Sequence, residues 1–262
     1  MLPTIDLNLS MAVFSLVGGF APALIWLWFW LREDDQKPEP KAIIAEAFVA
    51  GGLSVVLAFL IQRFLADWAT RAQWTGFDYS NPSFSLSFLI SSAGFIFIWA
   101  AVEEIVKLSA AYFTGFRSRN FDEPIDAMIY IITAAIGFAA VENTLFLLST
   151  LLSGETSIFF ILTGNLRFLG ATVVHIVSSA IVGGMISLSF CSARLTKTTA
   201  IIIGLCTATL LHGAFNFLII TSSGSGMLKI FVTLWLLAIF IIYFFEKIKT
   251  VICRPKILKE SI

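Results

Sequence analysis

Three ionisable residues stand close together inside a long apolar stretch of this sequence. The stretch runs from about residue 84 to residue 113 and contains Glu103, Glu104 and Lys107. Each such group costs about 2.5–3.5 kcal/mol when it is inserted at the centre of a membrane-spanning helix. A cost of that size indicates that these side chains serve a function rather than packing.

The spacing of these residues predicts how they can interact on a helix. Lys107 follows Glu104 by three residues and Glu103 by four, so its ammonium group can reach either carboxylate. Adjacent side chains diverge by about 100° around a helix axis, so the two glutamates cannot point the same way. We therefore expect one glutamate to pair with Lys107 while the other faces a cavity, and the spacing leaves open which does which.

Five further polar residues lie in apolar stretches downstream: Glu142, Arg167, His175, His212 and Asn216. His212 and Asn216 are four residues apart, which puts them on one face of a helix. A lone asparagine in a membrane span often makes only an interhelical hydrogen bond. An arginine near a span end can simply extend to the headgroups. For the set as a whole, intramembrane ionisable groups indicate a functional site.

These residue types together are typical of hydrolysis. A carboxylate in a low-dielectric site can act as general base on a water molecule. An imidazole and a carboxamide one helical turn apart can both donate to a developing oxyanion. The sequence contains no GxSxG or SxxK motif that would supply a covalent nucleophile. The set therefore predicts amide hydrolysis by an activated water.

A metal-assisted version of the same chemistry stays open. Glu142, His175 and His212 could form the two-histidine, one-carboxylate set that catalytic zinc uses. The HExxH spacing is absent, however, and the three residues come from three different apolar stretches. We favour a site without cofactor and keep a divalent metal such as zinc as the alternative.

The composition fixes the class of protein. The chain is 58% hydrophobic and 13% charged, with a mean hydropathy of +0.91, whereas soluble proteins are about 25% charged. Lys+Arg and Asp+Glu both total 17, so there is no basic surplus for nucleic-acid binding. The expected partner is the lipid bilayer.

The apolar runs predict an all-α polytopic membrane protein, a bundle of about seven transmembrane helices in one domain over residues 1–262. The predicted spans are 10–31, 42–64, 86–113, 125–150, 167–191, 198–220 and 227–247. Residues 157–165 are apolar but too short to cross a bilayer. They form either an extra re-entrant or interfacial helix, or an extension of the fifth span.

Basic residues predict the orientation, because Lys and Arg concentrate in cytoplasmic loops. In this model the cytoplasmic set comprises Arg32, Lys37, Lys41, Arg117, Arg119, Arg194, Lys197, Lys247, Lys249, Arg254, Lys256 and Lys259. Seven spans place the N-terminus outside and the C-terminus in the cytoplasm. We expect a multi-pass protein of the cell membrane.

The ordered motifs resemble those of the PrsW family of intramembrane proteases, which is related to the CAAX prenyl proteases and bacteriocin-processing enzymes. The resemblance is carried by EEIVK in the third span, GFAAVEN in the fourth, a histidine in the fifth and LHGAFN in the sixth. The stretch LREDDQKPEPKAIIAEAFVAGG also resembles the family's acidic linker, so most of the chain is covered.

The resemblance implies an all-α membrane core and site-1-type cleavage of single-span membrane proteins, in the best-known bacterial case an anti-sigma factor. It further implies a catalytic role for Glu103 and Glu104, and active-site roles for Glu142, His175 and His212. The prenyl-protease relatives end their second motif in histidine, where this chain has Glu142. That departure argues against prenylated substrates.

On this basis we assign Glu103 as general base, tuned and oriented by Glu104 and Lys107. His212 and Asn216 are assigned to the oxyanion site, and His175 and Glu142 to binding the water, a metal or the leaving amine; Arg167 supports them.

Two alternative functions stay open. Buried Glu, His and Lys also build proton relays in transporters, although the internal repeats common in transporters are not found. A non-catalytic scaffold that retains the site is the other alternative.

Overall fold

The computed structural model describes residues 9–32, 37–71, 86–154, 157–222 and 224–250, and these contain helices and no strand. The α-helices are α1 (Leu9–Arg32), α2 (Lys41–Arg71), α3 (Leu86–Ala111), α4 (Asp126–Leu152), α5 (Ser157–Leu166), α6 (Thr172–Leu188), α7 (Arg194–Thr221) and α8 (Ser225–Ile248). Two π-helical segments, η1 (Tyr112–Phe116) and η2 (Arg167–Ala171), follow α3 and α5. The all-α prediction is confirmed.

Within the described residues, six helices are long and apolar enough to cross a membrane, with α5, η2 and α6 counting as one continuous helix from Ile158 to Leu188. The remaining long helix is α3, which carries the three ionisable residues of EEIVK. Residues 157–165 therefore extend the fifth span, which was one of the two alternatives. Helix α2 runs to Arg71, past the predicted end at residue 64.

Helix α4 is the centre of the bundle. Every residue from Ile125 to Ala140 is buried, because α1, α2 and α6 all pack against this helix. Small residues permit the close packing. A Cβ atom added to Gly51 of α2 would lie 1.9 Å from the carbonyl oxygen of Ala134, so a larger residue there would force α2 away from α4.

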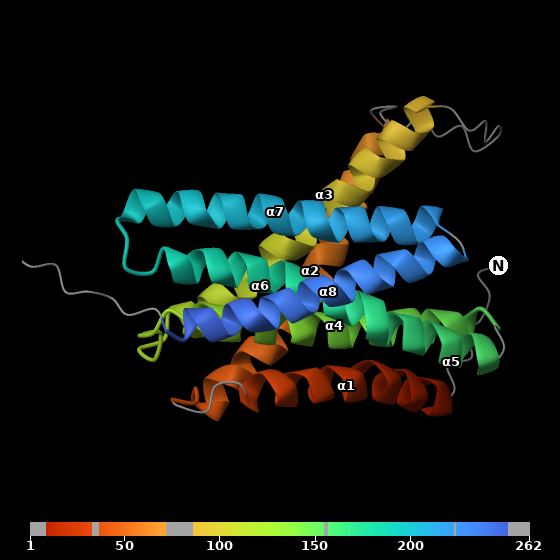
Figure 1. Ribbon diagram of the computed structural model, residues 1–262. Helices are drawn as coiled ribbons and strands as arrows, with labels where there is room; N and C mark the ends of the chain where they lie inside the picture. Colours follow the sequence, from red (N-terminus) through yellow and green to blue (C-terminus); the bar gives the residue numbers. More distant parts are fainter. Residues whose placement is uncertain (1–8, 33–36, 72–85, 155–156, 223, 251–262) are drawn as a thin grey trace, which may run out of the picture.

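Helices α6 and α3 complete the frame of the site. Helix α6 lies between α4 on one side and α7 and α8 on the other. Helix α3 contacts α2, α4, α6 and α7, and in Figure 1 its N-terminal part, together with the C-terminal end of α2, leans away from the other helices. The half of α3 that carries Glu103 and Glu104 therefore lies inside the bundle, where these residues are buried.

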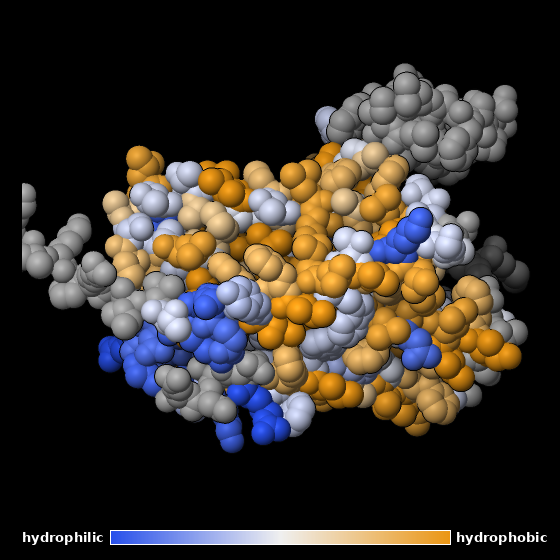
Figure 2. Space-filling view, in the orientation of Figure 1, coloured by the Kyte–Doolittle hydropathy of each residue, from blue (hydrophilic) through white to orange (hydrophobic). Residues whose placement is uncertain are grey.

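One end of the bundle is fastened by polar contacts. Lys37 pairs with Glu123, and the hydroxyl of Tyr130 donates to the carboxylate of Glu39. Burial raises the pKa of the Glu39 carboxyl above its ordinary value. Figure 2 shows hydrophobic surface over most of the visible face, with hydrophilic residues gathered at the end where α8 finishes and α4 begins. A large exposed apolar surface of this kind marks a membrane-interaction surface.

Candidate active site

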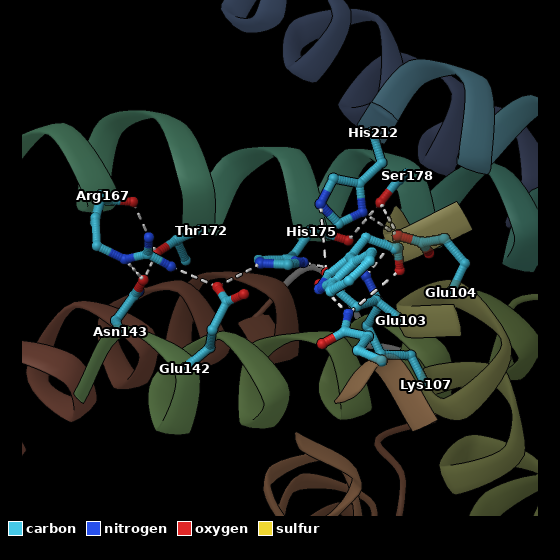
Figure 3. A network of polar contacts seen from close by, with 12 residues as sticks. Glu103, Glu104, Lys107, Glu142, Asn143, Arg167, Thr172, His175, Ser178 and His212 are labelled. Carbon is cyan, nitrogen blue, oxygen red and sulfur yellow. Dashed lines mark hydrogen bonds and ion pairs between the residues drawn. The ribbon is translucent and has the colours of Figure 1, made fainter. Parts of the chain in front are cut away.

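The ionisable residues predicted from sequence form one connected network in the middle of the bundle (Figure 3). Five helical elements contribute to it, with α3, α4, η2, α6 and α7 each supplying at least one polar side chain. The members are Glu103, Glu104, Lys107, Glu142, Asn143, Arg167, Thr172, His175, Ser178 and His212. Groups separated by up to 109 positions in sequence thus meet in one place.

The carboxylate of Glu104 is surrounded by donors. Lys107 lies 2.5 Å away through its Nζ atom, and both side chains are fully buried. The hydroxyl groups of Ser178 and Ser179 donate to the carboxylate at 2.8 and 3.2 Å. His212 Nδ1 lies 2.8 Å from the same carboxylate. With four partners, Glu104 is held in one position.

The neighbouring carboxylate of Glu103 is different. One oxygen accepts a hydrogen bond of 3.0 Å from Gln62 Nε2 on α2. The other oxygen, Oε2, is buried and has no hydrogen-bond partner among the described residues. His212 Nε2 lies 3.5 Å from this oxygen. Because a buried carboxylate oxygen without a partner is costly, this atom is the natural contact point for a water, a metal or a substrate.

The contacts of the two histidines indicate which ring nitrogens carry protons. Glu104 can only accept as a carboxylate, so His212 donates through Nδ1; in the neutral ring, Nε2 then keeps its lone pair and faces Glu103. Lys107 carries only donors, so His175 accepts through Nδ1 at 3.1 Å and donates through Nε2 to Glu142 at 3.1 Å. The two rings pack edge to face, with centroids 4.8 Å apart.

Arg167 anchors the other end of the network. Its guanidinium contacts Glu142 at 2.5 Å and Asn143 at 2.6 Å, and its Cζ atom lies 3.8 Å from the centre of the Phe146 ring. The side chain therefore points into the bundle rather than toward the headgroups. Arg167 opens the π-helical segment η2, and π-helical turns occur frequently at functional sites.

Two cavities adjoin the network. The α2 cavity, of about 700 Å³, lies between α2, α3 and α4 and is lined in part by Gln62 and Glu103. The α8 cavity, of about 580 Å³, lies between α3, α6, α7 and α8 and is lined in part by Arg167, His175 and His212. Four residues line both cavities and form a shared wall: Trp99, Glu142, Phe146 and Asn216.

The donor atoms also fit a metal ion. Among the described residues, Glu103, His175 and His212 form the group whose ligand atoms all lie within 4.8 Å of one another. Glu103 Oε2 and His212 Nε2 are free to coordinate, while His175 would exchange one present contact for the ion. The sequence proposed Glu142 as the carboxylate of this set. The structure has Glu103 in that place, because Glu142 is engaged by Arg167.

The structure therefore brings together all the site residues proposed from sequence, with Asn216 on the walls of both cavities. It also adds five polar residues that sequence reasoning missed, namely Gln62, Asn143, Thr172, Ser178 and Ser179. A signal existed for the serines, which follow His175 by three and four residues and so share its helix face. An isolated glutamine in an apolar helix was the signal for Gln62.

Comparison with known proteins identifies the family. The model of the PrsW family, described as intramembrane metalloproteases, matches residues 39–244. The chain belongs to the PrsW family. The matched region contains every residue of the network, and the sequence-based recognition of the family is confirmed.

Curated relatives support the same assignment. Protease PrsW of Bacillus subtilis is 26% identical over 226 residues, which cover 85% of this chain and 92% of that protein. Protease PrsW of Geobacillus kaustophilus is 31% identical over 139 residues, about half of each chain at 52% and 54%. Protease PrsW of Clostridioides difficile is 24% identical over 76% of both chains. No solved structure matches this chain. The chain is thus a multi-pass intramembrane protease of the PrsW family.

Proposed function

We propose that this PrsW-family protein is an endopeptidase that cuts single-span membrane proteins, of which anti-sigma-factor-like proteins are the expected class. The observation that carries the proposal is the unpartnered Oε2 atom of Glu103, which is buried beside His212 in a side chain that lines the α2 cavity. The kind of substrate is supported by the family resemblance alone. We also propose that residues 1–262 act as one membrane domain.

In this proposal Glu103 activates the attacking water. Its Oε2 atom takes a proton from the water as the oxygen forms a bond to the carbonyl carbon of the peptide. When the carbon–nitrogen bond breaks, the proton ends on the leaving amine. Gln62 holds the other oxygen of Glu103 at 3.0 Å and so fixes the direction in which Oε2 points. A positioned general base of this kind contributes about 10²–10⁴-fold in rate.

Glu104 has a positioning role. By accepting from His212 Nδ1 at 2.8 Å, it turns the Nε2 atom of that ring toward Glu103. A neutral His212 held in this way has no proton on Nε2 to donate to an oxyanion. We therefore assign the oxyanion contact to the carboxamide of Asn216, which lines both cavities, and assign His212 Nε2 to the water.

Glu142 and His175 are placed to serve the leaving group. Glu142 lines both cavities, and its carboxylate accepts from His175 Nε2 at 3.1 Å. Arg167, on the far side of Glu142, contacts the same carboxylate and so holds it in place beside His175. The pair can therefore guide a proton to the amine nitrogen as the peptide bond opens.

The metal-dependent version of this reaction is supported by two observations that sequence reasoning lacked, the family's description as metalloproteases and the compact donor set. Glu103, His175 and His212 would hold the ion, with Glu104 as the carboxylate that orients His212 from behind, an arrangement common at zinc sites. When bound, a divalent metal such as zinc supplies Lewis-acid polarisation of the water and of the substrate carbonyl.

We propose that the N-terminus lies outside and the C-terminus in the cytoplasm. Arg32, Lys37, Arg117 and Lys247 lie in or next to the connections assigned to the cytoplasmic side. Three basic tail residues that also support this orientation, Arg254, Lys256 and Lys259, lie outside the described residues. Cysteine labelling of the loops from either side of sealed cells tests the orientation.

The function is tested with purified protein in liposomes and a panel of tagged single-span membrane proteins that includes anti-sigma-like ones. Fragments are located by mass spectrometry, with Glu103→Gln as the paired control. We expect a cut within or next to the membrane-spanning segment that disappears in Glu103→Gln. Equal fragments from both proteins would show that Glu103 is not required. Proton-driven uptake by the same liposomes, without any cut, would favour the transporter alternative.

The metal version has its own test. The metal version predicts that elemental analysis finds about one divalent ion per chain, and less in the His212→Ala variant. Prolonged chelation should then abolish cleavage, and the same metal should restore it. Full cleavage by a protein that contains no metal would leave the metal-free glutamate mechanism.

A further inference from the structure

The groups that act on the substrate are divided between the two cavities. Glu103 and Gln62 line the α2 cavity and are absent from the walls of the α8 cavity. His175 and His212 line the α8 cavity and are absent from the walls of the α2 cavity. A peptide bond that contacts Glu103 and the histidines together must therefore lie at the shared wall formed by Trp99, Glu142, Phe146 and Asn216.

Both cavities are built to receive apolar side chains. The α2 cavity is walled largely by Val55, Val56, Phe59 and Leu145. Val56 and Phe59 are also more than half exposed on the outer surface of the bundle, at 57% and 59%, so this cavity adjoins the lipid-facing side. Volumes of about 700 and 580 Å³ fall within the range of about 300–1,000 Å³ that is typical of ligand pockets.

The α8 cavity has a different wall. Aromatic residues from three helices line it, namely Phe95 of α3, Phe215 of α7 and Phe231 of α8. Away from the polar network the walls of both cavities are apolar, so a charged or amide side chain placed there would lose its water without gaining a matching partner, and that loss is unfavourable. Large apolar side chains are therefore the occupants that the two cavities favour.

We propose that the substrate crosses the shared wall in an extended conformation, so that the residues flanking the cut bond place one large apolar side chain in each cavity. In an extended strand, successive side chains point to opposite sides, whereas on a helix they diverge by only about 100°. The two cavities adjoin different helices, α2 and α8, on either side of the wall. Val56 and Ala171 are thus specificity-determining residues, one for each side of the bond.

This inference rests on the proposed endopeptidase function, and its test needs a single-span substrate whose cut site in the wild-type protein is known. Four versions of that substrate carry Phe or Ala at each of the two flanking positions. Val56→Trp narrows the α2 cavity and Ala171→Phe narrows the α8 cavity. Ala45→Phe, on an exposed part of α2 that lines neither cavity, is the matched control.

We expect wild type and Ala45→Phe to cut the version with two phenylalanines fastest. For each narrowing variant, the cleavage rate of substrates with Phe at one flanking position should fall at least about tenfold, which is typical of discrimination by pocket size. The cleavage rate of substrates with Ala at that position should not change. The two variants should affect opposite positions. The proposal is overturned if both affect the same position, or if both slow all four substrates equally.

Cross-linking gives a second readout that does not depend on turnover. In the Glu103→Gln background, Val56→Cys and Ala171→Cys are small changes that leave the cavities open. We expect disulfide cross-links from position 56 to substrate cysteines on one side of the cut bond and from position 171 to the other side. Cross-links from both positions to the same side would refute the crossing geometry. A wild-type protein that cuts no substrate would instead refute the endopeptidase function itself.

Discussion

Glu103 and Glu104 are adjacent in sequence and both buried, yet their hydrogen-bond partners differ sharply. Four side chains surround the Glu104 carboxylate, and one of them is the fully buried ammonium of Lys107. Glu103 has one partner, Gln62, and a buried oxygen that contacts none of the described groups by a hydrogen bond. A carboxylate whose oxygens are all hydrogen-bonded stabilises the fold. A carboxylate with an unpartnered oxygen is available to bind water or substrate. The helices that pack around α3 therefore determine that Glu104 has the structural role and Glu103 the proposed catalytic one.

The largest expected effect follows from removing the open carboxylate. Glu103→Gln keeps the size of the side chain and its contact with Gln62, but it removes the group that takes a proton from water. We expect cleavage to fall by about 10²–10⁴-fold with little change in thermal stability in detergent. Cleavage rates in liposomes and a thermal unfolding curve measure the two effects. Unchanged cleavage would end the proposed division of roles.

Removing the fully hydrogen-bonded carboxylate of Glu104 should mainly lower the free energy of unfolding. Glu104→Gln leaves the buried Lys107 ammonium without its counter-charge, which is expected to cost about 3–5 kcal/mol. The double variant Glu104→Met with Lys107→Met removes both charges and should be clearly more stable than Glu104→Gln. Unfolding in mixed SDS micelles compares the three proteins. If the double variant is no more stable than the single one, the pair does not behave as a buried ion pair.

A smaller effect on the cleavage rate is expected from substitutions of Gln62, which orients the Glu103 carboxylate. Gln62→Leu removes the amide that holds Oε1, so Oε2 should no longer be fixed toward His212. We expect about a tenfold fall in kcat, equivalent to about 1.4 kcal/mol, with an unchanged KM. Gln62→Asn can reach less far and should restore only part of the rate. A fall in both constants together with lower stability would mean that Gln62 serves packing instead.

The smallest expected effect concerns the serines that donate to Glu104. Ser179→Ala loses one hydrogen bond of 3.2 Å out of four contacts at this carboxylate, so about 1–2 kcal/mol of stability should be lost. Cleavage should stay within a few-fold of wild type, because Lys107 and His212 still hold the carboxylate. Thermal unfolding and liposome cleavage test this, with Ser153→Ala, directly after α4, as a control for the loss of an exposed hydroxyl that lines neither cavity.

Much of the fold could be predicted from the sequence, because apolar runs must be long enough to cross a bilayer and must satisfy their own backbone. The positions of the long helices follow from this requirement. Whether residues 157–165 join the fifth span could not be decided in this way. A π-helical segment continues the helix through Arg167–Ala171, and the hydropathy pattern carries no sign of it.

The site was predictable to a similar degree. Charged groups and histidines are rare in apolar helices, so Glu142, His175 and His212 stand out in the sequence, and the structure brings them together. Lys107 could reach either glutamate on helical spacing, and only the placement of Ser178 and Ser179 on α6 shows why Glu104 is the partner. Gln62 could not be found, because neutral amides often serve helix packing and their partners depend on tertiary contacts.

The network in Figure 3 also determines when, during membrane insertion, the active site is complete. A ribosome delivers the helices to the membrane in order, and α3, α4, α6 and α7 each contribute at least one polar side chain to the network. His212 is the last of these to be synthesised and lies in the second half of α7. A nascent chain that has inserted only its first helices therefore holds glutamates without the histidine that faces them. Hydrolytic competence should arise only after α7 has entered the membrane, which protects the insertion machinery from its own product.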